Sequence, residues 1–249
     1  MSAQRGRLGA YALWQLRDYM FGPGFGTALV AMIVLIPMFI TKSAFSADGT
    51  SPRDMSRMMG QMFDQLIALV ALTGPILGAA GIASADRHPG LSRFLFAKPV
   101  RVDAYYLQAW VVRGFAFFAI AVVLGLVVNA FMVHVPMLEL LAVVAVAWLL
   151  IGGLGLLVSA LVPRDVAVLF LIYMVPVLLD SFVDNSRRVW WWVKPLLTIL
   201  PPTHKLEELR HAMLTAAPVV AADLWHVMLY GGACVVLGTY LVRRLPLVR

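Results

Sequence analysis

The sequence predicts an all-α membrane protein that crosses the bilayer six times. Of its 249 residues, 61% are hydrophobic and 13% are charged, which is far more apolar than an ordinary soluble domain. Uncharged runs of about 20 residues, the length that a helix needs to cross the ~30 Å hydrocarbon core, recur along the whole chain. Lipid leaves unpaired backbone groups unsatisfied, which favours helices for such runs. We therefore expect a single transmembrane domain over residues 1–249, located in the cell membrane.

The net charge indicates which partners the chain binds, and the cysteine content shows whether it can form a disulfide. The net charge is +7, but the basic residues are scattered between apolar runs and form no basic face with interleaved aromatic residues. The bilayer, with its anionic headgroups, is the simpler partner, and no nucleic acid is expected. Cys234 is the one cysteine, so a disulfide within the chain is impossible.

The N-terminal part predicts a helix on the membrane surface followed by the first span. Residues 1–23 place apolar side chains at helical spacing, with Arg17 and Asp18 among them and Trp14 suited to the headgroup level. The first span is expected at Phe25–Thr41, and a polar loop at Lys42–Met62.

Five more spans are expected. They cover Phe63–Ala83, Ala104–Met132, Leu138–Leu161, a stretch beginning at Val166, and Ala217–Val242. Residues 186–216 predict a re-entrant or interfacial segment, because Val189–Pro202 is short and contains prolines, and Thr203–Leu214 reads as an amphipathic helix. Small residues at Gly74–Gly81 and Gly152–Ser159 favour close helix packing, within one chain or between two copies.

Six spans place both termini on the same side of the membrane. Basic residues prefer the cytoplasmic side, and eleven of the 20 Lys and Arg residues fall on the side of the termini: Arg5, Arg7, Arg17, Arg87, Arg93, Lys98, Arg101, Arg164, Arg243, Arg244 and Arg249. We therefore expect cytoplasmic termini.

Common catalytic motifs are absent from the sequence. No G-x-x-x-x-G-K-[ST] loop, G-x-S-x-G elbow, Cys-x-x-Cys pair or H-E-x-x-H occurs. The chain is therefore expected not to be an enzyme, to have no catalytic residue and to bind no cofactor itself.

One arginine inside a predicted span and one group of polar residues are candidates for function. Arg113 lies well inside the third span, where a charge costs about 2.5–3.5 kcal/mol on insertion scales, so we expect it either to pair with a group such as an aspartate or to line a substrate pathway. A second group lies on one face of a predicted helix and is either a weak metal-binding candidate or a solvated polar face: His204, Glu207, Glu208 and His211.

The most highly charged stretch is Ser84–Asp103, between the second and third spans. Pro89 and Gly90 break the incoming helix, Leu91–Ala97 is long enough for about two helical turns, and Pro99 ends them. The result is a short transverse helix with an apolar face surrounded by basic residues.

This stretch resembles the coupling segment of the permease subunit of type-2 ABC exporters. The resemblance lies in Asp86, Arg87, Gly90, Leu91, Leu95, Pro99 and Val100, with Phe94 and Phe96 at apolar positions. His88 departs from the commoner Glu or Arg of that family. The full-length plan, with an N-terminal interfacial helix, six spans and a re-entrant stretch before the last span, is also similar.

The resemblance implies an exporter subunit driven by a separate cytoplasmic P-loop ATPase, which binds the ATP and Mg. Two permeases, identical or related, would enclose the substrate path. The residues implied to contact the ATPase are Asp86, Arg87, Gly90, Leu91, Phe94, Leu95, Pro99, Arg164 and Asp165. Two alternatives remain open: an intramembrane or metal-handling protein that uses the His204–His211 face, and a structural subunit of a membrane complex.

Overall fold

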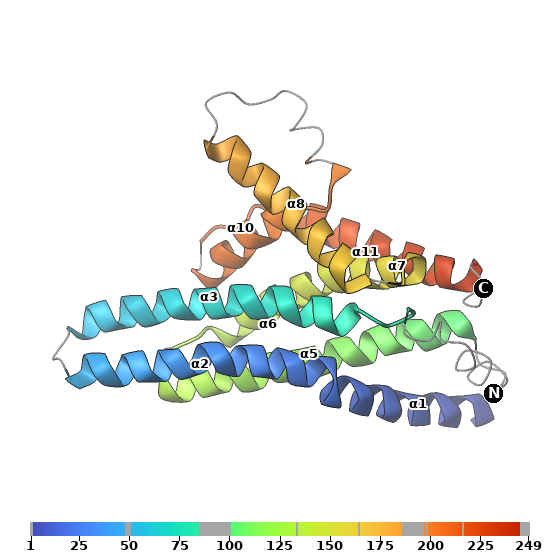
Figure 1. Ribbon diagram of the computed structural model, residues 1–249, viewed down its shortest axis with the longest axis horizontal. Helices are drawn as coiled ribbons and strands as arrows, with labels where there is room; N and C mark the ends of the chain where they lie inside the picture. Colours follow the sequence, from blue (N-terminus) through green and yellow to red (C-terminus); the bar gives the residue numbers. More distant parts are fainter. Residues whose placement is uncertain are drawn as a thin grey trace.

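The computed structural model describes residues 2–47, 51–84, 101–132, 134–163, 165–185, 197, 199–215 and 217–244. Within these ranges the regular structure is entirely helical. Figure 1 shows long helices α2, α3 and α5 lying side by side, with the C-terminal helices covering one side of them. The all-α prediction is confirmed.

The N-terminal residues form two successive helices, α1 (Ser2–Phe21) and α2 (Pro23–Ala47), separated at Gly22. α1 packs against the beginning of α5 (Val102–Phe131), where the ring of Tyr11 meets that of Tyr105 edge-on. The predicted N-terminal helix is therefore confirmed. Tyr11–Ala44 qualifies as one apolar membrane segment, so the placement of α1 at the membrane surface stays a prediction.

The predicted polar loop Lys42–Met62 is wrong. α2 continues to Ala47, and α3 (Pro52–Ala79) begins five residues later. The Ser51 hydroxyl accepts a hydrogen bond from the N–H of Asp54, and Pro52 occupies the first position of the helix. Both features favour a helix start, and they outweigh the polar composition of this stretch.

The third and fourth predicted spans are confirmed as helices. α5 (Val102–Phe131) is followed by one continuous helical run made of α6 (Met137–Ala147), the π-helical segment η2 (Trp148–Gly152) and α7 (Gly153–Leu161). Asn129 closes the short turn between them, because its side chain donates to the carbonyl of Val135 and accepts from the Val135 N–H at 3.1 and 2.7 Å. The two helices are therefore antiparallel neighbours.

The C-terminal part contains three described helices. These are α8 (Asp165–Asn185), α10 (Thr203–Leu214) and α11 (Ala221–Arg244). Figure 1 shows α8 leaving the other helices at a steep angle. The predicted helix Thr203–Leu214 matches α10 at both ends, and its Leu206 and Leu209 are buried as expected. Most of the predicted re-entrant stretch lies outside the described residues, so the re-entrant path stays a prediction.

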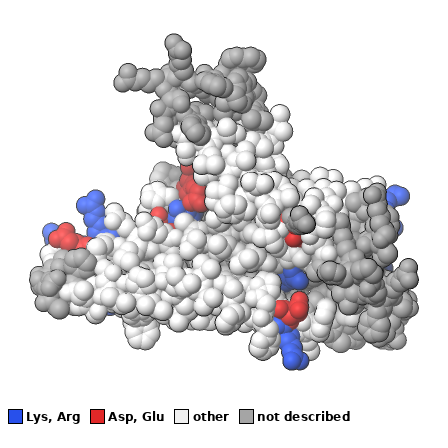
Figure 2. Space-filling view, in the orientation of Figure 1, with Lys and Arg blue, Asp and Glu red and all other residues white. Residues whose placement is uncertain are grey.

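In the part of the chain that the structure describes, five helical segments are long and apolar enough to cross a membrane, by length and composition. They are Tyr11–Ala44, Arg53–Ala79, Val102–Phe131, Met137–Leu161 and Ala221–Arg244. Large apolar side chains on their outer faces are exposed, such as Phe25 at 63% and Phe115 at 72%. On the face in Figure 2, charged side chains are few and broad surfaces between them carry none. The chain is therefore a membrane protein; the count of six spans stays a prediction.

Glycines allow α7 to lie close to its neighbours. A Cβ on Gly153 would lie 2.6 Å from the carbonyl oxygen of Gly231 on α11. Gly155 leaves no room for a side chain beside Ala79, at the end of α3. The small residues of Gly152–Ser159 thus serve packing within the chain, which was one of the two expected uses.

Candidate functional site

The first candidate site is the end of the molecule where residues 85–100 connect α3 to α5. One buried cluster joins the end of α3 and the turn after it to the middle of α1, the start of α5 and the ends of α7 and α11; it contains Ala83, Tyr11, Tyr106, Ala160 and Val242. Figure 1 marks both ends of the described chain at this same end of the molecule.

Two side chains fix the backbone that leaves α3. The hydroxyl of Ser159 accepts hydrogen bonds from the N–H groups of Ala83 and Ser84, at 2.8 and 3.0 Å. The carboxylate of Asp165 accepts from the Gly81 N–H at 2.6 Å and from the Ser84 hydroxyl at 2.7 Å. Ser159 is completely buried and Asp165 is 4% exposed. The start of the charged stretch is thus held by the fourth predicted span and by α8.

The conformation of Gly81 explains why α3 ends before the predicted Ala83. Its φ is 75°, in the left-handed region that glycine adopts at little cost. This turn directs the N–H groups of Gly81, Ala83 and Ser84 toward Asp165 and Ser159, and the helix stops at Ala79.

Arg113 binds the last turn of α3. Its Nη1 donates to the carbonyl oxygens of Gly78 and Ala80, both at 3.0 Å. Its Nη2 lies 3.8 Å from a carboxylate oxygen of Asp18 on α1. The residue is 9% exposed, and the carbonyls at a helix end otherwise lack partners. The sequence predicts that Arg113 either pairs with a group such as an aspartate or lines a substrate pathway. The structure shows the pairing: Arg113 bonds to two carbonyls and lies near Asp18.

Most residues implied to contact an ATPase lie outside the described residues. These are Asp86, Arg87, Gly90, Leu91, Phe94, Leu95, Pro99 and Arg164. Asp165 is described, but its carboxylate is buried and bound to Gly81 and Ser84. The described geometry gives Asp165 a role within the chain: it positions the segment that precedes the predicted contact residues.

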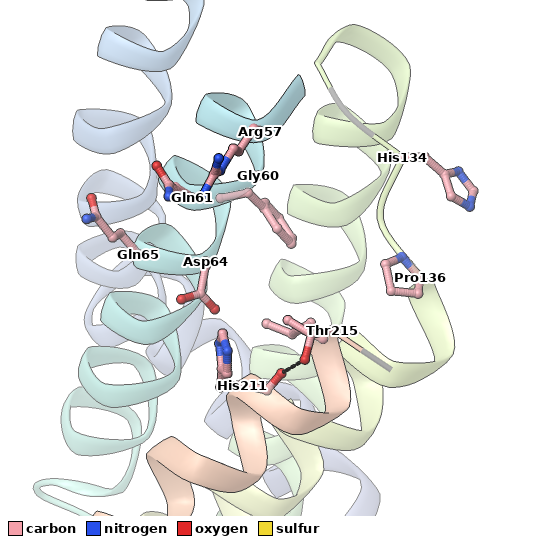
Figure 3. Close-up of a pocket in the computed structure, with 11 residues that line it drawn as sticks. Arg57, Gly60, Gln61, Asp64, Gln65, His134, Pro136, His211 and Thr215 are labelled. Atoms are coloured by element: carbon pink, nitrogen blue, oxygen red, sulfur yellow. Dashed lines mark hydrogen bonds between the residues drawn. The ribbon is translucent and has the colours of Figure 1, made fainter. Parts of the chain in front are cut away.

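The second candidate site is an open pocket of about 610 Å³ at the other end of α3. Its walls come from the first half of α3, the turn between α5 and α6, and the last turn of α10, as Figure 3 shows. Side chains that define it are Arg57, Gln61, Asp64, His134, His211 and Leu214. Polar groups from three elements thus converge over apolar walls, the usual composition of a ligand pocket.

An ion-pair network lies behind this pocket and ties α10 to α3 and α8. Arg210 donates through Nη1 to the carboxylate and the carbonyl of Asp64, and through Nε to Glu207 at 2.9 Å. The Tyr173 hydroxyl on α8 donates to the other oxygen of Glu207 at 2.6 Å. On the next helix, Asp223 accepts from Lys205 at 2.6 Å. The polar face of α10 is therefore used inside the molecule.

The face of α10 proposed as a weak metal site does not assemble one. Within the described residues, no group of three or more His, Cys, Asp or Glu side chains is placed to hold a metal ion. Of the candidates His204, Glu207, Glu208 and His211, Glu207 is bound to Tyr173 and Arg210. Partial burial lowers the pKa of His204 below its ordinary value, which favours a neutral imidazole at pH 7.

Sequence reasoning missed Ser159 and the partnership of Arg210 with Asp64. Ser159 was assigned to a packing face, because a small hydroxyl among glycines and leucines has no distinctive pattern. Arg210 lies on a helix for which the sequence predicts only an amphipathic pattern. Its partner lies 146 positions away in the sequence, a separation at which no local pattern links two residues.

No protein-family model matches the chain, and no curated protein matches it.

Proposed function

We propose that the chain is the transmembrane permease subunit of an ATP-driven exporter of the type-2 ABC kind. The observation that carries the proposal is the charged, proline-bounded stretch 84–103 between two apolar helices, in a chain without a nucleotide-binding loop. In this proposal Leu91, Phe94 and Leu95 dock on a separate cytoplasmic P-loop ATPase, which binds ATP and Mg. The permease itself performs no chemistry.

The anchoring of this stretch supports a mechanical role. Its first residues are held by Ser159 and Asp165, and the helix before it is held by Arg113. A force on the stretch therefore acts on α3, α5, α7 and α8 together, because each of these helices contributes or receives one of the bonds. Packed helices transmit such displacements since they shift between discrete arrangements.

The membrane topology in this proposal has six spans and cytoplasmic termini. Figure 1 marks both ends of the described chain at one end of the molecule, which supports an even number of crossings. The five apolar segments together with α8 give six. A second permease copy or a related subunit completes the substrate path. The buried bonds of Arg113 favour packing over a direct contact with substrate.

Crosslinking tests the proposed contact. A photoreactive residue in place of Phe94, introduced in the native host, is expected to crosslink to a protein that carries a phosphate-binding loop, identified by mass spectrometry. The purified complex in proteoliposomes is expected to hydrolyse ATP, and Leu91→Glu with Phe94→Glu is expected to separate the ATPase while the chain stays in the membrane. Arg53→Glu, at the other end of α3, is the control.

Two outcomes count against the proposal. If the doubly substituted chain retains its ATPase and its rate of hydrolysis, the stretch is not the coupling segment. If the crosslinks at position 94 lead only to proteins without a nucleotide site, the chain is better described as a structural subunit of a membrane complex.

A further inference from the structure

The pocket beside α10 is separate from the residues that the proposed function uses. It lies along residues 57–65 of α3, whereas the anchored turn follows the opposite end of that helix, at residues 80–84. From Asp64 to Ala79 is about 22 Å at the rise of an α-helix. The pocket therefore needs an explanation of its own.

The pocket carries charges of both signs at two levels. Arg57 is exposed and forms no ion pair with any other described residue. Asp64 is paired with Arg210, but the same guanidinium is also bound to Glu207. One cation shared between two carboxylates leaves a net negative charge at the end of the pocket that contains Asp64. The end of the pocket that contains Arg57 is positively charged.

Arg57 and Asp64 are seven residues apart, so they lie on one face of α3 about two turns, or 10.5 Å, from each other. Figure 3 shows both on the side of α3 that faces the pocket. Gly60 lies between them on this face and lines the pocket, and a Cβ placed there would meet nothing within 4 Å. The space between the two charges is therefore open.

The remaining walls supply neutral polar and apolar groups. Gln61, His134 and His211 line the pocket from three elements, and Phe63 and Leu214 provide apolar surface. A ligand with only a negative charge would be repelled by the Asp64 carboxylate, and a ligand with only a positive charge would be repelled by Arg57. A molecule that carries both charges satisfies both levels at once, and an alkyl part is compatible with the apolar wall.

We propose that this pocket binds the zwitterionic polar end of an amphipathic molecule, with the anionic group at Arg57 and the cationic group at Asp64. The inference goes beyond the proposed function and does not depend on it, because binding involves this chain alone. It assigns the ligand by its headgroup chemistry, which is shared by membrane lipids with zwitterionic headgroups and by soluble zwitterionic amphiphiles.

Four probes with the same short chain and different headgroups test the assignment. These are hexylphosphocholine, hexyl phosphate, hexyltrimethylammonium and hexyl glucoside, each added below its micelle concentration to the full chain purified in a maltoside detergent. Calorimetry is expected to show the highest affinity for hexylphosphocholine, and hexyl glucoside is expected to bind at least about tenfold more weakly, a difference of 1.4 kcal/mol.

Variants locate the binding. Arg57→Gln is expected to weaken the binding of hexylphosphocholine about fivefold to tenfold, which corresponds to about 1–1.4 kcal/mol, and to reverse the preference in favour of hexyltrimethylammonium. Gly60→Leu fills the open space and is expected to abolish binding without unfolding the chain, since a Cβ there would meet nothing within 4 Å and the side chain would extend into the pocket. The matched controls are Arg53→Gln on α3 and Gly232→Leu on α11, where a Cβ also meets nothing within 4 Å.

Several results overturn the inference. Equal affinity for hexyl phosphate and hexylphosphocholine identifies an anion site, and equal affinity for all four probes identifies a purely apolar one. Unchanged binding by Gly60→Leu places the probe elsewhere. A further comparison, with glycerophosphocholine and with short-chain phosphatidylcholine, separates a soluble zwitterion from a lipid as the source of the headgroup. Loss of ATPase coupling leaves all of these measurements unchanged, so the two proposals fail independently.

Discussion

Nη1 of Arg113 lies 3.0 Å from the carbonyl oxygen of Gly78, in the last turn of the preceding span. A buried charged group is costly unless its hydrogen bonds are satisfied, and Arg113 is 9% exposed. Here the arginine satisfies carbonyl groups that the end of α3 leaves without partners inside the helix. These hydrogen bonds pair Nη1 of the buried guanidinium with the carbonyl groups of Gly78 and Ala80. They connect α5 to the end of α3, where the charged stretch begins.

Replacing Arg113 should destabilise the chain far more than replacing its acidic neighbour. Arg113→Met leaves the carbonyls of Gly78 and Ala80 without this donor, and each unsatisfied buried group costs about 1–3 kcal/mol. Asp18→Asn should cost no more than about 0.5 kcal/mol, because the Asp18 side chain is 56% exposed and lies 3.8 Å from the guanidinium. Unfolding in mixed micelles measures both values; similar losses in the two variants would contradict this account.

Removal of the Ser159 hydroxyl should loosen the turn after α3. Ser159→Ala leaves the N–H groups of Ala83 and Ser84 without their acceptor. One such hydrogen bond is worth about 1–1.5 kcal/mol, so amide exchange at these two residues should become about tenfold faster. Hydrogen exchange measured by mass spectrometry on the peptide that contains residues 80–84 gives the comparison. Ser181→Ala, at an exposed serine of α8, is the control and should leave this peptide unchanged.

Two adjacent glycines of α11 should respond in opposite ways to alanine. A Cβ on Gly231 would lie 2.6 Å from the carbonyl oxygen of Leu149, whereas a Cβ on Gly232 would meet nothing within 4 Å. Gly231→Ala should therefore cost about 1–3 kcal/mol through overpacking. Gly232→Ala should be neutral or stabilise the helix by up to about 1 kcal/mol. Thermal unfolding in detergent distinguishes them, and equal midpoints would show that η2 and α11 are not in close contact.

The sequence predicts the helices well because their apolar runs have the length of a membrane span. α5, α11 and the helical run from Met137 to Leu161 begin and end within a few residues of the predicted limits. The exceptions have local causes. Ser51 and Pro52 start α3 earlier than its apolar run suggests, and the positive φ of Gly81 ends it earlier.

The candidate sites were harder to predict because their partners are distant in sequence. Arg113 stood out as a lone charge in an apolar run, yet its main acceptors are backbone carbonyls, which no side-chain pattern reveals. Asp165 is among the residues that the resemblance implies to contact an ATPase, but its side chain is buried and bonded within the chain. The pocket requires α3, the α5–α6 turn and α10 to come together, and this depends on tertiary packing that single-helix periodicity does not contain.

The charge network around Arg210 should show strong coupling between its members. The Arg210 side chain is 11% exposed, while the side chains of Asp64 and Glu207 are 34% and 35% exposed. Arg210→Met leaves both carboxylates close together without a cation. Removal of one member of a fully buried pair costs about 3–5 kcal/mol, and we expect about 2–3 kcal/mol here because water reaches the two acids.

Neutralising the acids should then restore stability. In the triple variant Arg210→Met, Asp64→Asn, Glu207→Gln, the repulsion between the carboxylates is gone, and about half of the loss should be recovered. Unfolding free energies of the single, double and triple variants form a mutant cycle that measures the coupling directly. Glu208→Gln, at an exposed position on the same helix, is the control. Additive losses across the cycle would mean that Arg210 holds α10 through the Asp64 carbonyl and apolar packing, and that its charge contributes little.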